Sequence, residues 1–143
     1  METPRAMKPH PPPAASARAR TFPAHPSALY RIRRFLRESV ADAGLKRAAT
    51  DDLVLAVSEA CANSLQHTAT VDIRVTCIVS SDRVEVEVED DGLFGRRIPI
   101  PELEVEGGHG IPLMMALMDE VQIRKGTRLH PGTVVRLTKY RGT

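Results

Sequence analysis

The amino-acid sequence predicts an α+β fold in which helices cover one face of a mostly antiparallel sheet. Apolar residues follow helical spacing over 27–43 and again after Thr50. The spacing then changes to alternation over 71–77 and 84–88, which is typical of strands with one buried face. Helices followed by a hairpin, another helix and a second hairpin predict a two-layer architecture.

The length and composition indicate one folded domain preceded by a tail. At 143 residues the chain is long enough for one domain with a proper core and too short for two. Its content of 42% hydrophobic and 27% charged residues is ordinary for a globular protein. Residues 1–17 are rich in proline and alanine without periodicity, so we expect a disordered tail there and the domain over 18–143.

The charge and the scarcity of aromatic residues argue against a nucleic-acid partner. Aromatic residues make up 3% of the chain and tryptophan is absent, whereas single-stranded nucleic acid is held by aromatic stacking. The net charge is +2, but four basic residues and one acidic residue within 1–20 contribute +3, which leaves about −1 for the rest. A nearly neutral domain has no strong attraction to DNA, so we expect no direct nucleic-acid binding.

Other patterns predict a cytoplasmic location without a membrane segment. No stretch is apolar enough to span a bilayer, and the N-terminus lacks the apolar centre of a secretory signal. Cys61 and Cys77 lie within apolar patterns and make no metal-ligand spacing with a pair of histidines. We therefore expect two reduced cysteines in the core of a cytoplasmic protein.

The first predicted elements are a short edge strand over 18–22, closed by Pro23, and a helix over 27–43 that ends at Gly44. Arginines form the outer face of this helix, namely Arg31, Arg33, Arg34 and Arg37. A solvated surface is the favoured interpretation of these arginines, and a partner-binding surface is the alternative.

The second predicted helix begins after Thr50, which is a good N-cap residue. Asp51 and Asp52 follow it and complement the positive end of the helix dipole. Residues spaced by three, four and seven gather on its apolar face, namely Leu53, Val57, Ala60, Cys61 and Ser64.

The remaining elements complete the two-layer pattern. Residues 80–82 form the turn of the first hairpin, and 92–109 indicate a loop because they lack periodicity. A third helix is expected over 110–118, followed by strands over 120–125 and 133–140.

A polar stripe runs beside the apolar face of the second helix. At 100° per residue Glu59 and Asn63 lie on this stripe, and Gln66 and His67 extend it by one turn. Such a stripe forms the rim of a pocket, but ordinary helix surfaces carry polar residues too. The stripe by itself therefore does not identify a site.

Two further segments carry residues that suit a ligand. Asp90 ends a buried strand before Gly92, which suits a carboxylate that points into a cavity and accepts a hydrogen bond from an exocyclic amine such as that of adenine. An Asp-Gly pair is equally common in turns. Gly107, Gly108 and Gly110 precede an apolar helix, whose free amides can bind phosphate, and a glycine-rich hinge is the equal alternative.

Together these segments resemble the Bergerat nucleotide site of the superfamily that includes the gyrase, histidine-kinase and MutL ATPases. Four motifs occur in order: Glu-x-x-x-Asn on a helix, Asp-x-Gly after a strand, Gly-x-Gly opening a helix, and Gly-Thr entering a strand. The resemblance extends over 22–139. It implies a two-layer α/β sandwich of the Bergerat, histidine-kinase-like type, with three helices on one face of the sheet.

Within this superfamily the chain is most similar to the stand-alone anti-sigma-factor serine/threonine kinases. The segments DDLVLAVSEACANSLQH, GGHGIPLMMALMDEV and GTVVRLTK resemble theirs. The resemblance implies a kinase that binds ATP and Mg²⁺, phosphorylates a serine of an anti-sigma-factor antagonist, and sequesters a sigma factor. It also implies a homodimer.

The resemblance assigns a role to each site residue. Glu59 orients or deprotonates the attacking hydroxyl, and Asn63 supplies a neutral oxygen to Mg²⁺. Asp90 binds the adenine amine, with Gly92 behind it. The other nucleotide-binding residues are Gly108 and Gly110 near the phosphates and Thr133 near the adenine.

One position departs from the family pattern. The family usually continues Asp-x-Gly with a second glycine two residues later, where this chain has Phe94. The departure supports an alternative, a non-catalytic ATP-binding regulatory module that acts only through protein partners. The intact Glu59 and Asn63 favour the kinase, because binding alone requires no base.

Overall fold

The structure is a computed structural model, and it describes residues 16–67, 70–91, 110–125 and 132–142. Five strands and three helices are present in this part of the chain, in the order β1 (Ser16–Pro23), α1 (Ala28–Ser39), α2 (Arg47–His67), β2 (Asp72–Val79), β3 (Arg83–Asp90), α4 (Gly110–Leu117), β4 (Glu120–Lys125) and β5 (Thr133–Tyr140). The strands form one sheet in the order β1-β2-β3-β5-β4, and every neighbouring pair is antiparallel.

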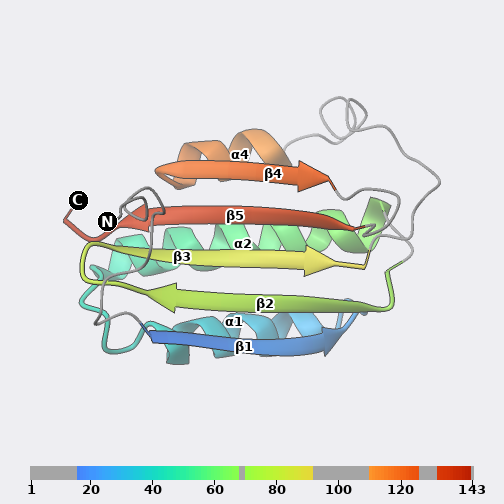
Figure 1. The fold of residues 1–143 in the computed structure, drawn as a ribbon, viewed down its shortest axis with the longest axis horizontal. Helices are drawn as coiled ribbons and strands as arrows, with labels where there is room; N and C mark the ends of the chain where they lie inside the picture. The colour runs from blue at the N-terminus through green and yellow to red at the C-terminus, as the bar shows by residue number, and fades with distance from the viewer. Residues whose placement is uncertain (1–15, 68–69, 92–109, 126–131, 143) are drawn as a thin grey trace, which may run out of the picture.

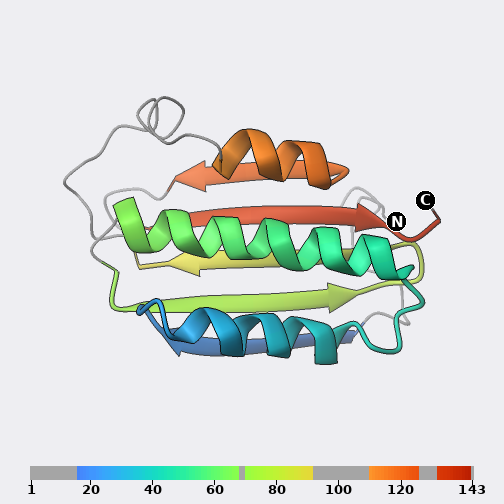
Figure 2. The same cartoon turned by 180° about the vertical axis from the view of Figure 1, so that it is seen from behind.

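The described helices all cover the same face of the sheet (Figures 1 and 2). Helix α1 packs over β1 and β2, α2 lies over β3 and β5, and α4 packs against α2 and β4. The predicted α+β sandwich with a mostly antiparallel sheet and three helices on one face is therefore confirmed.

The core lies between the two layers because one face of each central strand is apolar. Along β3, Val84, Val86 and Val88 are buried while Glu85 and Glu87 between them are partly exposed. Full burial of each such side chain contributes about 1.5–3 kcal/mol. The helices supply the other half of the core, chiefly through Ile32, Phe35, Leu36, Leu53, Val57 and Met114.

Lys139 of β5 links the sheet to both α4 and α2. The Nζ of Lys139 donates a hydrogen bond of 2.6 Å to the carbonyl of Leu117, the last residue of α4. The same atom lies 3.6 Å from a carboxylate oxygen of Asp52 in α2. A cation at the C-terminus of α4 also complements the helix dipole, so Lys139 stabilises the position of α4 beside α2.

The start of α2 differs from the sequence-based expectation. Helix α2 begins at Arg47, and the amide of Thr50 donates to the carbonyl of Lys46 over 3.0 Å. Thr50 therefore lies inside the helix, and its predicted role as N-cap is wrong. Alanines at positions 48 and 49 have high helix propensity, which extends the helix by one turn beyond the predicted start.

Two further boundaries differ from the expectation. Helix α1 ends at Ser39, and a turn follows that closes at Gly44 with φ +80°. Glycine suits the end of this turn because L side chains rarely adopt that backbone conformation. Strand β1 begins at Ser16, whose pairing with Val79 extends the strand beyond the predicted 18–22. Its position at the sheet edge is as predicted.

The two cysteines are buried in the core and free of disulfides. Burial raises the pKa of the Cys61 thiol from 9.0 to about 12. The pKa of Cys77 rises to about 11 for the same reason, against a smaller opposing effect of Arg18. Both side chains therefore behave as apolar core residues. No helix among the described residues is long and apolar enough to cross a membrane.

These raised thiol pKa values predict a loss of stability at alkaline pH. Above pH 9.0 an unfolded thiol ionises while the folded one stays protonated, so the free energy of unfolding falls as the pH rises. We expect about 1 kcal/mol for each thiol by about pH 10. Urea denaturation at pH 8 and 10 measures this loss, and the variant Cys61→Ala/Cys77→Ala should lose less. An equal loss in both proteins would contradict the prediction.

Candidate functional site

The ends of four elements lie together at one end of the molecule (Figure 2). Helix α2 ends there, α4 begins there, and the C-terminus of β3 lies beside the N-terminus of β5. The antiparallel pairing of β3 with β5 places Asp90 opposite Thr133. All of the predicted site residues that the structure describes belong to these four elements, so the fold brings separate motifs to one place.

Asp90 is the buried acidic group of this site, with 4% of its surface exposed. Its Oδ2 accepts a hydrogen bond of 2.8 Å from the Ser64 hydroxyl of α2. Its Oδ1 accepts one of 3.2 Å from the backbone amide of Thr133 in β5. Since the two donors come from a helix and a strand, they set the orientation of the carboxylate. A buried carboxylate requires such partners because its desolvation is otherwise costly.

Gly132 allows the chain to approach Asp90 closely. It adopts φ +132°, which L side chains rarely adopt. A Cβ atom at this position would lie 2.6 Å from the backbone oxygen of Asp90. Only glycine therefore lets β5 begin at a distance where the Thr133 amide reaches the Asp90 carboxylate.

The adjacent acidic residue, Asp91, has a different task. Its Oδ2 accepts a hydrogen bond of 3.1 Å from the amide of Val71. Its own amide donates to the hydroxyl of Thr70 over 3.0 Å. These two bonds tie the end of β3 to the connection between α2 and β2, so Asp91 braces the backbone beside the site.

Glu59 and Asn63 lie four residues apart on α2, and both are half-buried. This spacing places them on the same side of the helix. Ser64 follows Asn63 and is rotated by about 100° from it, which turns its hydroxyl toward Asp90. Helix α2 therefore carries both the polar stripe and one of the donors that hold the buried carboxylate.

The glycines of the predicted site are described only in part. Gly110 is the first residue of α4, as predicted for a helix N-terminus. Gly92 and Gly108 lie outside the described residues, as do Phe94 and the predicted loop over 92–109. For Thr133, the structure records the backbone amide bonded to Asp90, and the expected contact of its hydroxyl with adenine stays a prediction.

Sequence reasoning missed two residues of this site. Ser64 was expected only on the apolar face of α2, and it is indeed buried, with 7% exposed. A hydroxyl on an otherwise apolar face was the available signal, because a buried hydroxyl needs a partner. Gly132 appeared in the Gly-Thr motif, but its close approach to Asp90 depends on the pairing of β3 with β5.

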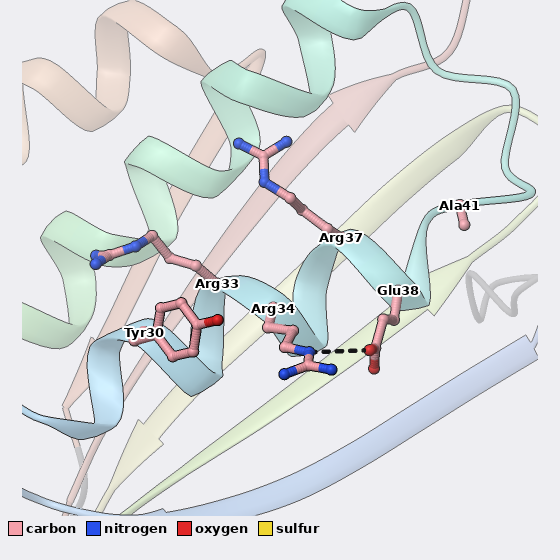
Figure 3. A pocket seen from close by; sticks show the side chains of 6 residues that line it. All are labelled: Tyr30, Arg33, Arg34, Arg37, Glu38 and Ala41. Carbon is pink, nitrogen blue, oxygen red and sulfur yellow. Dashed lines mark ion pairs between the residues drawn. The ribbon is translucent and has the colours of Figure 1, made fainter.

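The arginines of α1 form a separate surface (Figure 3). A groove there is lined by Tyr30, Arg33, Arg34, Arg37, Glu38 and Ala41. Arg34 pairs with Glu38 over 3.4 Å and Arg37 pairs with Asp51 over 3.2 Å. These pairs are exposed and contribute little stability. Tyr30 is 64% exposed, so the groove combines positive charge with an uncovered aromatic ring.

The chain is similar to a known domain family and to several serine-protein kinases. Residues 22–139 match the profile of the histidine kinase-like ATPase domain. The serine-protein kinase RsbW of Bacillus subtilis (strain 168) is 34% identical over 134 residues, which cover 82% of this chain and 81% of that protein. The protein of the same name from Bacillus pumilus is 31% identical over 138 residues, covering 83% of this chain and 82% of its own length.

Two solved structures are also similar. The crystal structure of the RsbU and RsbW domains of a Mycobacterium tuberculosis protein has a TM-score of 0.67 and 26% identity. The match covers 87% of this chain and 32% of that longer chain. The histidine kinase domain of a blue-light activated kinase from Erythrobacter litoralis has a TM-score of 0.55 and 24% identity, with 85% of this chain and 62% of that chain covered. This second likeness concerns the fold alone.

Because Gly132 lies close to the backbone of Asp90, a single added methyl group at this position should lower the stability of the protein markedly. Gly132→Ala should lower the free energy of unfolding by about 2 kcal/mol or more, since it adds both backbone strain and a contact with Asp90. Gly142→Ala is the matched control, because nothing lies within 4 Å of a Cβ there. Urea denaturation compares the two variants, and similar stabilities would contradict the role given to Gly132.

Proposed function

We propose that this chain, which belongs to the histidine kinase-like ATPase domain family, transfers the γ-phosphate of ATP to a serine of an anti-sigma-factor antagonist. The chain is a protein serine/threonine kinase of that family. In the proposal it also sequesters a sigma factor. The observation that carries the proposal is the buried carboxylate of Asp90, held by donors from α2 and β5 at the end where α4 begins.

The base end of the proposed nucleotide site is Asp90. A carboxylate accepts hydrogen bonds and donates none, so it pairs with the exocyclic amine of adenine and disfavours the carbonyl that guanine carries at the same place. The buried position excludes water and so strengthens this discrimination. Gly92 and Thr133 complete this end of the site in the proposal.

The phosphate end of the proposed site lies on α2 and begins at Asn63, the residue before Ser64. Asn63 is suited to Mg²⁺ because its side-chain oxygen is a neutral hard ligand, and Mg²⁺ takes most other ligands from phosphates and water. Among the described residues, no group of three or more His, Cys, Asp or Glu side chains is placed to hold a metal ion by itself. A single amide ligand is compatible with a cation that ATP brings. The ion would neutralise charge on the phosphates.

Glu59 is the proposed general base. Its carboxylate accepts the proton of the substrate serine as the serine oxygen bonds to the γ-phosphorus. The bond from the γ-phosphorus to the bridging oxygen breaks, and ADP leaves. Gly108 and Gly110 let the start of α4 approach the phosphates, where helix amides favour negative charge.

The proposed substrates need a docking surface away from the nucleotide, and we assign this to the groove on α1. Its exposed arginines fit a partner that presents acidic side chains, and Tyr30 offers an apolar contact at its edge. A homodimer is part of the proposal as well, and the outer edge of β1 offers one surface for it. ATP as the donor and two free cysteines fit a cytoplasmic location.

Two variants separate binding from transfer. Asp90→Asn should weaken ATP binding by at least tenfold, because an amide nitrogen replaces an acceptor. Glu59→Gln should bind ATP as the wild type does, and should lower phosphotransfer to a candidate antagonist by a factor of about 100 or more. Calorimetric titration with ATP and Mg²⁺ measures the first effect, and transfer of labelled γ-phosphate measures the second. Full transfer by Glu59→Gln would remove it as the base.

The same experiments test the alternative of a non-catalytic module. Wild-type protein that binds ATP but transfers no phosphate to any antagonist of the same organism would favour that alternative. The departure at Phe94 is the observation that supports it.

A charge reversal tests the partner surface. Arg33→Glu should weaken binding of the unphosphorylated antagonist by about tenfold, because Arg33 lies in the groove. The affinity for ATP should stay unchanged. Arg74→Glu is the matched control, since Arg74 is exposed on the face of the sheet opposite the helices. Surface plasmon resonance compares the two variants, and equal weakening by both would indicate a general effect of charge.

A further inference from the structure

We infer that Ser64 is a positioning residue for adenine recognition, and that its hydroxyl makes the discrimination between nucleotides depend on the orientation of Asp90. This inference rests on the proposed function and deepens it. Neither the motifs nor the site residues expected from them include Ser64, which lies beside Asn63 within the Glu-x-x-x-Asn helix.

The contact is short, buried and made between distant parts of the chain. The Ser64 Oγ donates to Asp90 Oδ2 over 2.8 Å, across 26 positions of sequence. Only 7% of Ser64 and 4% of Asp90 are exposed. In such surroundings the hydrogen bond between a hydroxyl and a carboxylate is stronger than the same bond in water. Its loss leaves the carboxylate without that donor.

Donors from both layers of the fold bind the Asp90 carboxylate. The Thr133 amide binds Oδ1 and belongs to a strand whose register with β3 is set by the sheet. The Ser64 hydroxyl binds the other oxygen from the helical layer. With both donors, the plane of the carboxylate is set from two directions. Loss of the Ser64 hydroxyl removes the donor from the helical layer, so the plane of the carboxylate is no longer set from that direction.

The position of Ser64 on α2 links the two ends of the proposed site. Asn63 and Ser64 are consecutive residues of one helix, so the metal ligand and the donor to Asp90 move together. Sites built on a rigid helix hold their groups within a fraction of an ångström, which a loop does not. The distance between the base-binding carboxylate and the phosphate end is thereby set through α2.

Loss of this orientation should weaken the binding only of nucleotides that carry the exocyclic amine. An oriented acceptor rejects a ligand that lacks its donor far more strongly than a loosely held one. Purine riboside triphosphate has the shape of ATP without that amine. Loss of the Ser64 hydroxyl should therefore affect ATP and leave this analogue unaffected, whereas damage to packing would affect both.

The experiment measures the affinity of both nucleotides, with Mg²⁺, for wild-type protein, Ser64→Ala and Ser64→Thr. Ser64→Ala should bind ATP about tenfold more weakly and bind purine riboside triphosphate within twofold of the wild type. Ser64→Thr keeps the hydroxyl and should recover most of the ATP affinity. Ser58→Ala is the matched control on the same helix, because its hydroxyl bonds the carbonyl of Val54 over 2.9 Å and not the site.

The outcomes distinguish this inference from the function on which it rests. Wild-type protein that binds neither nucleotide would overturn both. Wild-type protein that prefers ATP, with Ser64→Ala unchanged or equally weakened toward both nucleotides, would overturn the role of Ser64 alone. Urea denaturation of each variant without nucleotide provides the check on folding, and a threonine variant that folds but does not recover ATP affinity would also count against the hydroxyl.

Discussion

The buried carboxylate of Asp90 is the constraint on which the functional end of this protein depends. A carboxylate away from water needs donors, and here they come from both layers of the sandwich. That requirement fixes α2 against β3, and it fixes the start of β5 against the end of β3. Gly132 satisfies the same requirement in the backbone, because any larger residue would push β5 away.

Helix α2 combines stability and function in one element. Its apolar side completes the core through Leu53, Val57 and Cys61, while its polar stripe carries Glu59 and Asn63. Packing against α1, α4 and the sheet leaves the helix little freedom to move. A rigid support of this kind suits a site in which base recognition and phosphate chemistry must keep a constant distance.

The two proposed surfaces of the protein lie on different elements. The proposed nucleotide site lies where α2, α4, β3 and β5 meet, and the arginine groove lies along α1. Helix α1 contacts α2 directly, so a partner on one surface and a nucleotide on the other are joined through the same helix that holds the site. This arrangement is physically suited to coupling between partner and nucleotide, although coupling requires two states of the connecting elements.

Periodicity in the sequence by itself determined the fold class and the strand alternation, because these patterns are local and repeat with the geometry of a helix or a strand. The order of the motifs singled out Glu59, Asn63 and Asp90, whose roles in the site stay predictions. The start of α2 was misjudged because Thr50 and the aspartates after it imitate a helix start that lies one turn earlier. Tertiary structure alone decided that Ser64 donates to Asp90, that Asp91 braces the backbone instead, and that Gly132 must lie against β3. Those contacts join residues distant in sequence, and their partners are chosen by strand register and helix packing, which no short stretch of sequence contains.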